Sequence, residues 1–263
     1  MIEASGLHVT FNPGMATENH VLRGLDLLID EGSFVTVIGS NGAGKSTLLN
    51  SLAGDFKPSA GSVRIGGQDV TRMPAWKRSG MCARVFQDPL AGTCGPLTIE
   101  ENLALADDRG HSRSLRAALS AKRRERYREL LAPLGLGLER RLTDRMELLS
   151  GGQRQAVSLL MATMQPSRIL LLDEMTASLD PGMAEFVMEL TRQLIAERRL
   201  TAMMVTHSMS QALAYGDRTL MMHQGNFVLD LRGEQRASVT VAQLIERFSH
   251  ARGSQLDQDS LLL

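Results

Sequence analysis

Residues 39–47 constrain the fold of this chain more than any other segment. They read Gly-Ser-Asn-Gly-Ala-Gly-Lys-Ser-Thr and satisfy the pattern G-x-x-x-x-G-K-[ST]. The apolar run Phe34–Ile38 precedes them, and a helix-forming segment, Ser46–Ala53, follows and stops before Gly54. A strand, a glycine-rich loop and a helix in this order predict an α/β protein with a phosphate-binding loop.

The residue types in this loop suit the binding of a nucleoside triphosphate. Glycines leave room for backbone N–H groups to surround phosphate oxygens, and the helix N-terminus adds a positive dipole. The Lys45 ammonium can reach the β- and γ-phosphates, and the Ser46 hydroxyl can bind Mg²⁺. The alternative, a glycine-rich turn before an ordinary helix, is disfavoured by the flanking strand and helix. The predicted nucleotide-binding residues are Gly39, Ser40, Asn41, Gly42, Ala43, Gly44, Lys45, Ser46 and Thr47.

Length and composition bound the class of protein. A chain of 263 residues can bury one α/β core with room for an inserted subdomain. Its 29 Lys and Arg balance 29 Asp and Glu, so the net charge gives no argument for nucleic acid, and we expect no nucleic-acid partner. The cysteines Cys82 and Cys94 do not suggest a disulfide framework or a zinc site, so a reducing cytosolic setting fits best. We recognise no signal peptide or membrane-spanning run, so other subunits must supply any membrane span.

Hydrophobic patterning predicts strands that alternate with helices. Near the N-terminus we expect an exposed loop over 12–20 and three short strands, Leu7–Phe11, Leu25–Ile29 and Phe34–Ile38. A further strand, Ser62–Ile65, enters a hairpin at Gly66-Gly67. Farther along the chain we expect a buried strand at Ile169–Leu172, a helix from Pro181 to about Arg199 and a strand at Ala202–Thr206. Continuous apolar strands between helices predict a parallel sheet that is covered on both faces.

The middle of the chain is predicted to form a helical subdomain, about 90–165, inserted in a single domain over 1–250. A helix is expected to start at Thr98, and the stretch 109–131 is rich in arginine and strongly helix-forming. Thr240 and Gln243 resemble a capping box that opens a short helix through Phe248. We expect residues 251–263 to form a mobile tail.

The arginines of the stretch 113–128 allow two interpretations. The favoured one is a solvated helical face, because helix faces of one charge sign are common. The functional alternative is an anionic membrane surface, which attracts polybasic helices.

A carboxylate pair ends the apolar run 169–172. Asp173 and Glu174 are expected at the C-terminal edge of the sheet, where phosphate-binding loops of this type also lie. There Asp173 would hold Mg²⁺, directly or through water, and Glu174 would polarise the attacking water. The alternative is a strand that ends in ordinary surface acids.

A third motif, Leu149-Ser150-Gly151-Gly152-Gln153, precedes a helix-forming run from Arg154 to Met164 and offers a second anion-accepting helix N-terminus. With the two other motifs in this order, the sequence resembles the nucleotide-binding subunits of ABC transporters over about residues 3–250. The resemblance implies a P-loop NTPase domain of the ABC type in the α/β class, with a mainly parallel core sheet, an antiparallel β subdomain and an inserted helical subdomain. It also implies ATP and Mg²⁺ as cofactors and ATP hydrolysis as the reaction.

The same resemblance assigns roles to further residues. Gln87, in Val-Phe-Gln-Asp-Pro, matches the glutamine loop, whose side chain takes part in metal binding and catalysis. His207 matches the histidine that contacts the γ-phosphate, and Phe11 lies where the family stacks an aromatic ring on adenine. Ser178-Leu179-Asp180 matches the segment exchanged across the dimer.

By this resemblance two copies sandwich two ATP molecules head to tail. The signature residues of one copy, Ser150, Gly151, Gly152 and Gln153, complete the site of the other. All catalytic positions are intact, which predicts two active sites in a homodimer, and a heterodimer with a degenerate partner remains an alternative. Met175 and Ser178 depart from the residues expected beside the base and in the exchanged segment. They bear on the rate of hydrolysis.

Longer stretches narrow the resemblance to one subgroup. Residues 38–45, 84–93, 158–163 and 221–225 are similar to ATPases of bacterial importers assigned to tryptophan, tyrosine or related small substrates. This implies membrane permease subunits, docked around Gln87 and 88–105, a substrate-binding protein in the same system, and a peripheral location on the cytoplasmic face of the cell membrane. The alternative is a soluble non-transport ABC ATPase with a regulatory or assembly role. The substrate never touches this subunit, so the transported solute stays open at this point.

Overall fold

A computed structural model describes residues 1–111 and 117–249 of the chain. Contacts divide it into two compact units. Unit 1 contains residues 1–75 and the described residues from 201 onward, and unit 2 contains the described residues between 76 and 200. Residues 113–116 of the basic stretch, residue 250 and the predicted tail 251–263 lie outside the described residues. The single domain over 1–250 with an inserted subdomain stays a prediction.

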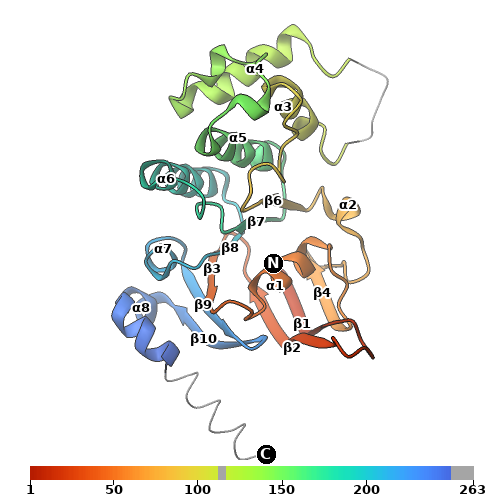
Figure 1. Ribbon diagram of the computed structural model, residues 1–263, viewed down its shortest axis with the longest axis vertical. Helices are drawn as coiled ribbons and strands as arrows, with labels where there is room; N and C mark the ends of the chain where they lie inside the picture. The colour runs from red at the N-terminus through yellow and green to blue at the C-terminus, as the bar shows by residue number, and fades with distance from the viewer. Residues whose placement is uncertain (112–116, 250–263) are drawn as a thin grey trace, which may run out of the picture. The chain divides into compact units, whose positions relative to one another are not determined.

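Unit 1 begins with an antiparallel sheet in the order β2-β1-β4-β5 (Figure 1). Its strands are β1 (Ile2–Phe11), β2 (Asn19–Ile29), β4 (Ala60–Ile65) and β5 (Gln68–Asp69). The hairpin at Gly66-Gly67 is confirmed, since β4 and β5 pair across it.

The two N-terminal strands are longer than the predicted segments Leu7–Phe11 and Leu25–Ile29. β1 and β2 pair from Ile2 and Ile29 to Phe11 and Asn19, with three shifts of register on the way. At these bulges an extra residue is accommodated in one strand, so pairing continues past the polar residues and glycines that interrupt the hydrophobic alternation. The predicted loop is correspondingly shorter than expected, because Asn19 and His20 belong to β2.

Unit 1 also contains the parallel strands that lead to the phosphate-binding loop. β3 (Phe34–Gly39) pairs in parallel with β8 (Ala202–Val205) and with β9 (Arg218–His223). The hairpin partner of β9 is the antiparallel strand β10 (Asn226–Arg232). Residues 34–38 are all buried, as a strand inside a parallel sheet requires. The predicted parallel pairing of continuous apolar strands is therefore confirmed.

Helices α1 (Lys45–Ala53), α7 (Met209–Ala214) and α8 (Gly233–Ala237) belong to the same unit, and a further helix covers 241–249. That last helix starts as predicted, because Thr240 and Gln243 form a reciprocal capping box. The Thr240 N–H donates to Gln243 Oε1 at 3.0 Å, and the Gln243 N–H donates to Thr240 Oγ1 at 3.3 Å. Leu244 of this helix packs in a buried cluster with Ile38 and Met221 of β3 and β9.

Unit 2 contains the parallel pair β6 (Cys82–Val85) and β7 (Ile169–Asp173) together with most of the helices (Figure 1). The helices are α2 (Ala75–Arg78) at the unit boundary, α3 (Ile99–Asp107), α4 (Ala121–Leu131), α5 (Gly151–Thr163) and α6 (Pro181–Arg198). Short 3-10 turns lie at Ala132–Leu134, Leu138–Arg140 and Met146–Leu148. The predicted start of α3 is confirmed, since Thr98 and Glu101 form a capping box.

The prediction of a helix across 109–131 is wrong for its described first part. Residues 109–111 and 117–120 are not helical, and α4 begins only at Ala121, where the Ser120 side chain caps its first turn. Helix propensity is a weak prior, and a serine that accepts the Arg123 N–H sets the boundary here.

The arginines of α4 bind acids of the same unit. Arg124 Nε donates to Glu100 Oε2 at 2.8 Å, and Arg126 donates to Asp107 Oδ1 at 2.9 Å. Both acids are buried residues of α3, and a buried carboxylate needs a counter-charge. These pairs favour the structural interpretation of the basic stretch over a membrane surface.

Candidate nucleotide site

The phosphate-binding loop is built from residues whose side chains would not fit. Strand β3 ends at Gly39, and a Cβ atom there would lie 2.3 Å from the Met222 carbonyl oxygen of the paired strand β9. Gly44, just before α1, has φ +99°, and a Cβ atom there would lie 2.9 Å from Leu22 Cδ2. Glycine is required at both positions, so the loop presents backbone rather than side chains.

Lys45 lies across this loop with only 5% of its surface exposed. Its ammonium donates to the carbonyl oxygens of Gly39 at 2.9 Å and Ser40 at 3.2 Å. No side chain among the described residues caps the first turn of α1, so the helix end offers backbone N–H groups and a positive dipole. A glycine cradle, a helix N-terminus and a lysine fit a polyphosphate.

His207 lies one strand away from the loop, within the same unit. It follows β8, and the preceding Thr206 N–H donates to the Val37 carbonyl oxygen of β3 at 3.1 Å. The next residue, Ser208, caps α7 by accepting the Gln211 N–H at 3.2 Å. His207 is exposed. The carboxyl ends of β3 and β8 thus place the loop and His207 at the same edge of the sheet.

In unit 2 the same arrangement holds Gln87, Asp173 and Glu174. Val85 pairs with Leu172 in the parallel register of β6 and β7. Gln87 therefore follows one strand, and Asp173 ends the neighbouring one. Parallel strands bring their carboxyl ends to one edge, which explains why two motifs far apart in the sequence meet there.

Asp173 is held by an arginine that the sequence analysis did not assign. Arg84 donates to Asp173 Oδ2 at 2.9 Å, and each side chain is 14% exposed. The Arg84 guanidinium also lies over the Phe86 ring, 4.4 Å from its centroid. The Phe86 carbonyl oxygen accepts from Gln155 of α5 at 3.0 Å. The residues just before Gln87 therefore contact both β7, through Arg84, and α5, through Phe86.

Glu174 has the left-handed backbone conformation, with φ +42°. Its carbonyl oxygen accepts the Ala177 N–H at 3.0 Å, which closes a turn directly after β7. The neighbouring Met175 is buried, and the Thr191 hydroxyl donates to its sulfur at 3.9 Å. Met175 is therefore part of the packing under this turn, whereas Ser178 is exposed.

The signature residues form the N-terminus of α5. Helix α5 begins at Gly151 rather than Arg154, because Ser150 and Gln153 make a capping box with hydrogen bonds of 3.3 and 3.2 Å. Gly152 is buried, and a Cβ atom there would lie 2.7 Å from the Met183 Cε atom of α6. Ser150 and Gly151 are exposed at the helix end.

Comparison with known families decides the class to which these motifs belong. The family model described as ABC transporter matches residues 22–177, more than half of the chain. The chain belongs to the ABC transporter family. It is accordingly an ABC ATPase, an ATP-binding transporter subunit, and the predicted fold class is confirmed.

Two curated relatives of this ABC ATPase are informative. A tyrosine transport ATP-binding protein of Clostridioides difficile is 39% identical over 95% of this chain and 100% of the relative. The thiamine import ATP-binding protein ThiQ of Chelativorans is 37% identical over 78% of each chain. Among solved structures, an ATP-binding cassette that forms a dimer in a post-hydrolysis state with ADP and Pi is 29% identical. Its TM-score is 0.75, over 88% of this chain and 98% of that chain.

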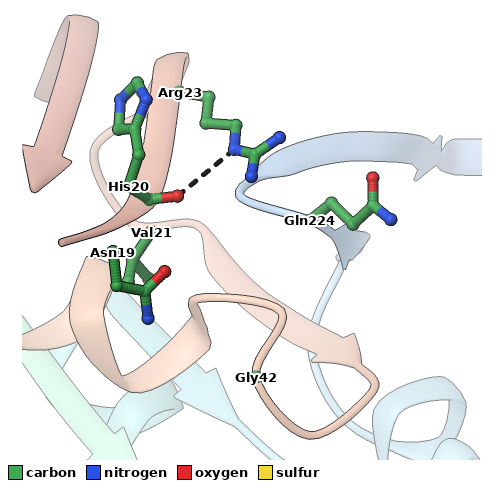
Figure 2. Close-up of a pocket in the computed structure, with 6 residues that line it drawn as sticks. All are labelled: Asn19, His20, Val21, Arg23, Gly42 and Gln224. Carbon is green, nitrogen blue, oxygen red and sulfur yellow. Dashed lines mark hydrogen bonds between the residues drawn. The ribbon is translucent and has the colours of Figure 1, made fainter. Parts of the chain in front are cut away.

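The structure of the ABC ATPase adds a pocket beside the phosphate-binding loop (Figure 2). The pocket measures about 300 Å³ and lies in unit 1 between the start of β2, the loop and the β9–β10 turn. Its lining residues are Asn19, His20, Val21, Arg23, Gly42 and Gln224. Only Gly42 was predicted, because the contribution of β2 depends on a register that sequence alone does not show.

Phe11 lies close to this pocket in the sheet without lining it. It ends β1 opposite Asn19 of β2, and its half-buried ring meets the Phe56 ring edge-on at 5.1 Å. The role of Phe11 in stacking on adenine stays a prediction.

The ABC ATPase carries its predicted site residues in two sets. Unit 1 holds the loop 39–47, Phe11 and His207, and unit 2 holds Gln87, 150–153, Asp173 and Glu174. No helix in the described part of the chain combines the length and the apolar character that crossing a bilayer requires. Of the two cysteines, Cys82 is half-buried and Cys94 is exposed.

Proposed function

We propose that this ABC ATPase is the ATP-hydrolysing motor of an importer for a small solute such as an aromatic amino acid. The observation that carries the proposal is the relative from Clostridioides difficile, which is named for tyrosine transport and which this chain matches over its full length. A thiamine importer ATPase matches a smaller share of the chain, which supports import more broadly.

In this proposal the loop 39–47 binds the ATP phosphates through its backbone N–H groups and Lys45. The near-complete burial of the Lys45 side chain against the loop supports this role. By the family resemblance, Ser46, Gln87 and Asp173 would hold Mg²⁺, which when bound would neutralise the charge of the phosphate oxygens. Proteins bind Mg²⁺ through one or two carboxylates together with substrate phosphates, and Asp173 would supply such a carboxylate.

Glu174 is the proposed general base and His207 the proposed contact to the γ-phosphate. Glu174 directly follows the proposed Mg²⁺ ligand in the sequence, and as a general base it would accept a proton from the attacking water. The N-terminus of α5, where Ser150 and Gly151 are exposed, is proposed together with Gly152 and Gln153 to receive the ATP phosphates of a second copy. Phe11 is proposed to stack on the adenine.

The proposed assembly is a homodimer of this chain docked on permease subunits at the cytoplasmic face of the cell membrane, served by a substrate-binding protein. ATP then closes the dimer and hydrolysis releases it, a ligand-driven shift between two states. The solved relative that forms a dimer with ADP and Pi supports such a cycle.

The catalytic part is tested with Glu174→Gln. The variant should bind ATP as tightly as the parent protein and form an ATP-dependent dimer, while its turnover falls by a factor of about 10² or more, the range expected for a lost general base. Glu185→Gln, an exposed position on α6, is the matched control and should retain turnover. Near-normal hydrolysis by Glu174→Gln would reject Glu174 as the base.

The transport part needs a different experiment. The chain is purified with the permease and the binding protein encoded beside it, and tyrosine, tryptophan and phenylalanine are titrated onto the binding protein. Binding of one of these amino acids, together with stimulation of ATPase activity by the loaded binding protein, is the expected result. An ATPase that purifies as a dimer with no membrane partner would instead support a regulatory role.

A further inference from the structure

We propose that Arg84 is a positioning residue that fixes Asp173 in the orientation needed to bind Mg²⁺. The inference rests on the proposed role of Asp173 as the metal ligand. Its structural basis is the 2.9 Å hydrogen bond from Arg84 to Asp173 Oδ2, between two side chains that are each only 14% exposed. A charge-assisted bond of this length, largely withdrawn from water, is stronger than an ordinary surface ion pair.

The fold places Arg84 for this contact. Arg84 lies on β6 opposite Leu171 in the parallel register, and Asp173 is two residues farther along β7. Side chains at such diagonal positions on one face of a sheet are within reach of each other when one is long. The contact therefore joins residues 89 positions apart in the sequence.

The arginine is itself fixed from a second side. Its guanidinium lies over the Phe86 ring at 4.4 Å, and the Phe86 backbone is held by Gln155 of α5. A guanidinium that is already ordered by a ring loses less entropy when it binds a carboxylate. Arg84 thus connects the proposed metal ligand to the segment that carries Gln87.

The contact leaves part of the carboxylate available. Oδ2 is bonded to Arg84, and among the described residues no donor is bonded to Oδ1. A carboxylate can accept at both oxygens, so Oδ1 can face the ion or one of its waters while Oδ2 keeps its arginine. Residues that orient a metal ligand in this way contribute strongly to metal affinity.

Arg84 has two opposing effects on Mg²⁺ binding. The arginine charge repels a divalent cation, whereas the hydrogen bond holds the ligand in one rotamer. Loss of a partner that orients a metal ligand usually weakens metal binding by about 10-fold to 100-fold, so positioning should outweigh repulsion. Removing Arg84 is therefore expected to weaken Mg²⁺ binding, and pure charge repulsion would strengthen it.

The test measures Mg²⁺ binding without turnover. A fluorescent ATP analogue is bound to the Glu174→Gln variant, and Mg²⁺ is titrated to find the concentration of half-maximal response. Arg84→Met, which keeps the apolar stem, should raise that concentration about 10-fold, and Arg84→Lys, which keeps one donor, should raise it less. Nucleotide binding in EDTA should not change, because the phosphate-binding loop does not depend on Arg84. Arg192→Met, which removes an arginine paired with Glu189 on α6, is the matched control and should leave the titration unchanged.

The variant Asp173→Asn separates failure of the inference from failure of the proposed function. If Asp173→Asn and Arg84→Met each weaken Mg²⁺ binding, and Arg84→Met weakens it no further once Asp173→Asn is present, the inference is supported. If Asp173→Asn weakens Mg²⁺ binding but Arg84→Met and Arg84→Lys leave it unchanged or strengthen it, Arg84 is a structural ion pair and the inference is overturned. If Asp173→Asn itself has no effect, the proposed metal role of Asp173 is overturned, and the inference falls with it. Should Arg84→Met fail to fold, Arg84→Lys and Arg84→Gln carry the same comparison.

Discussion

The backbone at Glu174 leads to a prediction that separates stability from activity. Glu174 has φ +42°, and an L-residue in this region costs about 1–2 kcal/mol relative to its preferred conformations. Glycine avoids that cost but loses about 0.5–1 kcal/mol more conformational entropy on folding than alanine does. The balance favours glycine over alanine at this position by about 0.5–1 kcal/mol. We therefore expect Glu174→Gly to have a larger free energy of unfolding than Glu174→Ala.

The difference in stability between Glu174→Gly and Glu174→Ala does not depend on the contacts of the glutamate side chain. Glycine and alanine variants both lose every contact of the Glu174 carboxylate, so their difference reports the backbone alone. Both should lack ATP turnover if Glu174 is the base. The more stable protein is then as inactive as the less stable one, because the strained position carries the chemistry.

Two control positions test whether the backbone conformation decides which of the glycine and alanine variants is more stable. Arg199, the C-cap of α6, has φ +49°, so Arg199→Gly should again be more stable than Arg199→Ala, with ATPase activity retained in both. Arg192 lies inside α6, where the order should reverse, with alanine more stable than glycine by about 1 kcal/mol.

The assay is urea unfolding of the nucleotide-free protein, followed by far-ultraviolet circular dichroism, with ATPase rates on the same preparations. Free energies are compared only between variants with equal denaturant slopes, since a change in slope signals a change in the unfolded or native state. The reasoning is refuted if the pair at position 174 shows the order found at position 192.

Two further predictions concern thiol reactivity and acid stability. Burial raises the pKa of the Cys82 thiol to about 11, whereas Cys94 is exposed, so iodoacetamide at pH 8 should react with Cys94 first. Loss of the fast phase in Cys94→Ser checks this, and equal rates at both thiols would contradict it. At Asp230, burial alone would raise the pKa, but hydrogen bonds from Arg218 and Arg232 outweigh it and lower the pKa to about 2. A folded-state pKa below the unfolded value stabilises the protein above about pH 4, and this contribution is lost as the pH falls towards 2. Asp230→Asn should therefore cost about 1 kcal/mol at pH 7, after allowance for a side chain that is 39% exposed, and progressively less as the pH falls through the folded-state pKa. Thermal unfolding against pH measures the difference, and a pH-independent difference would contradict the assignment.

Local signals explain which elements could be predicted from the sequence. The buried strands 34–38 and 169–172 are continuous apolar runs, and the helix starts at Thr98 and Thr240 carry capping boxes. Each of these signals lies within a few residues of the element it specifies. The extension of β1 and β2 carries no such signal, because pairing between strands with bulges extends them across polar residues. The late start of α4 depends on one capping serine that outweighs a long run of helix formers.

The features of the candidate site likewise fall into those that the sequence predicts and those that it does not. Within each unit, motif residues that follow parallel strands lie at one edge of the sheet, whatever their distance in sequence, so this placement could be predicted. The contact of Arg84 with Asp173 in unit 2 could not, nor could the pocket lining by Asn19 and Gln224 in unit 1, since each depends on packing between distant segments. Arg84 belongs to a stretch that resembles one subgroup of importer ATPases, and that resemblance indicated the family without indicating the contact.

The two acids at the end of β7, Asp173 and Glu174, are held by different means, and this bears on how they act. Asp173 is fixed through its side chain, by Arg84 on the neighbouring strand. Glu174 is set by its backbone, whose left-handed turn redirects the chain immediately after the strand. An extended backbone would point consecutive side chains to opposite faces of the sheet. The left-handed residue breaks that alternation at the point where, in the proposed mechanism, a metal ligand and a general base must serve the same phosphate. The cost of about 1–2 kcal/mol at Glu174 is therefore accounted for by the proposed chemistry rather than by packing.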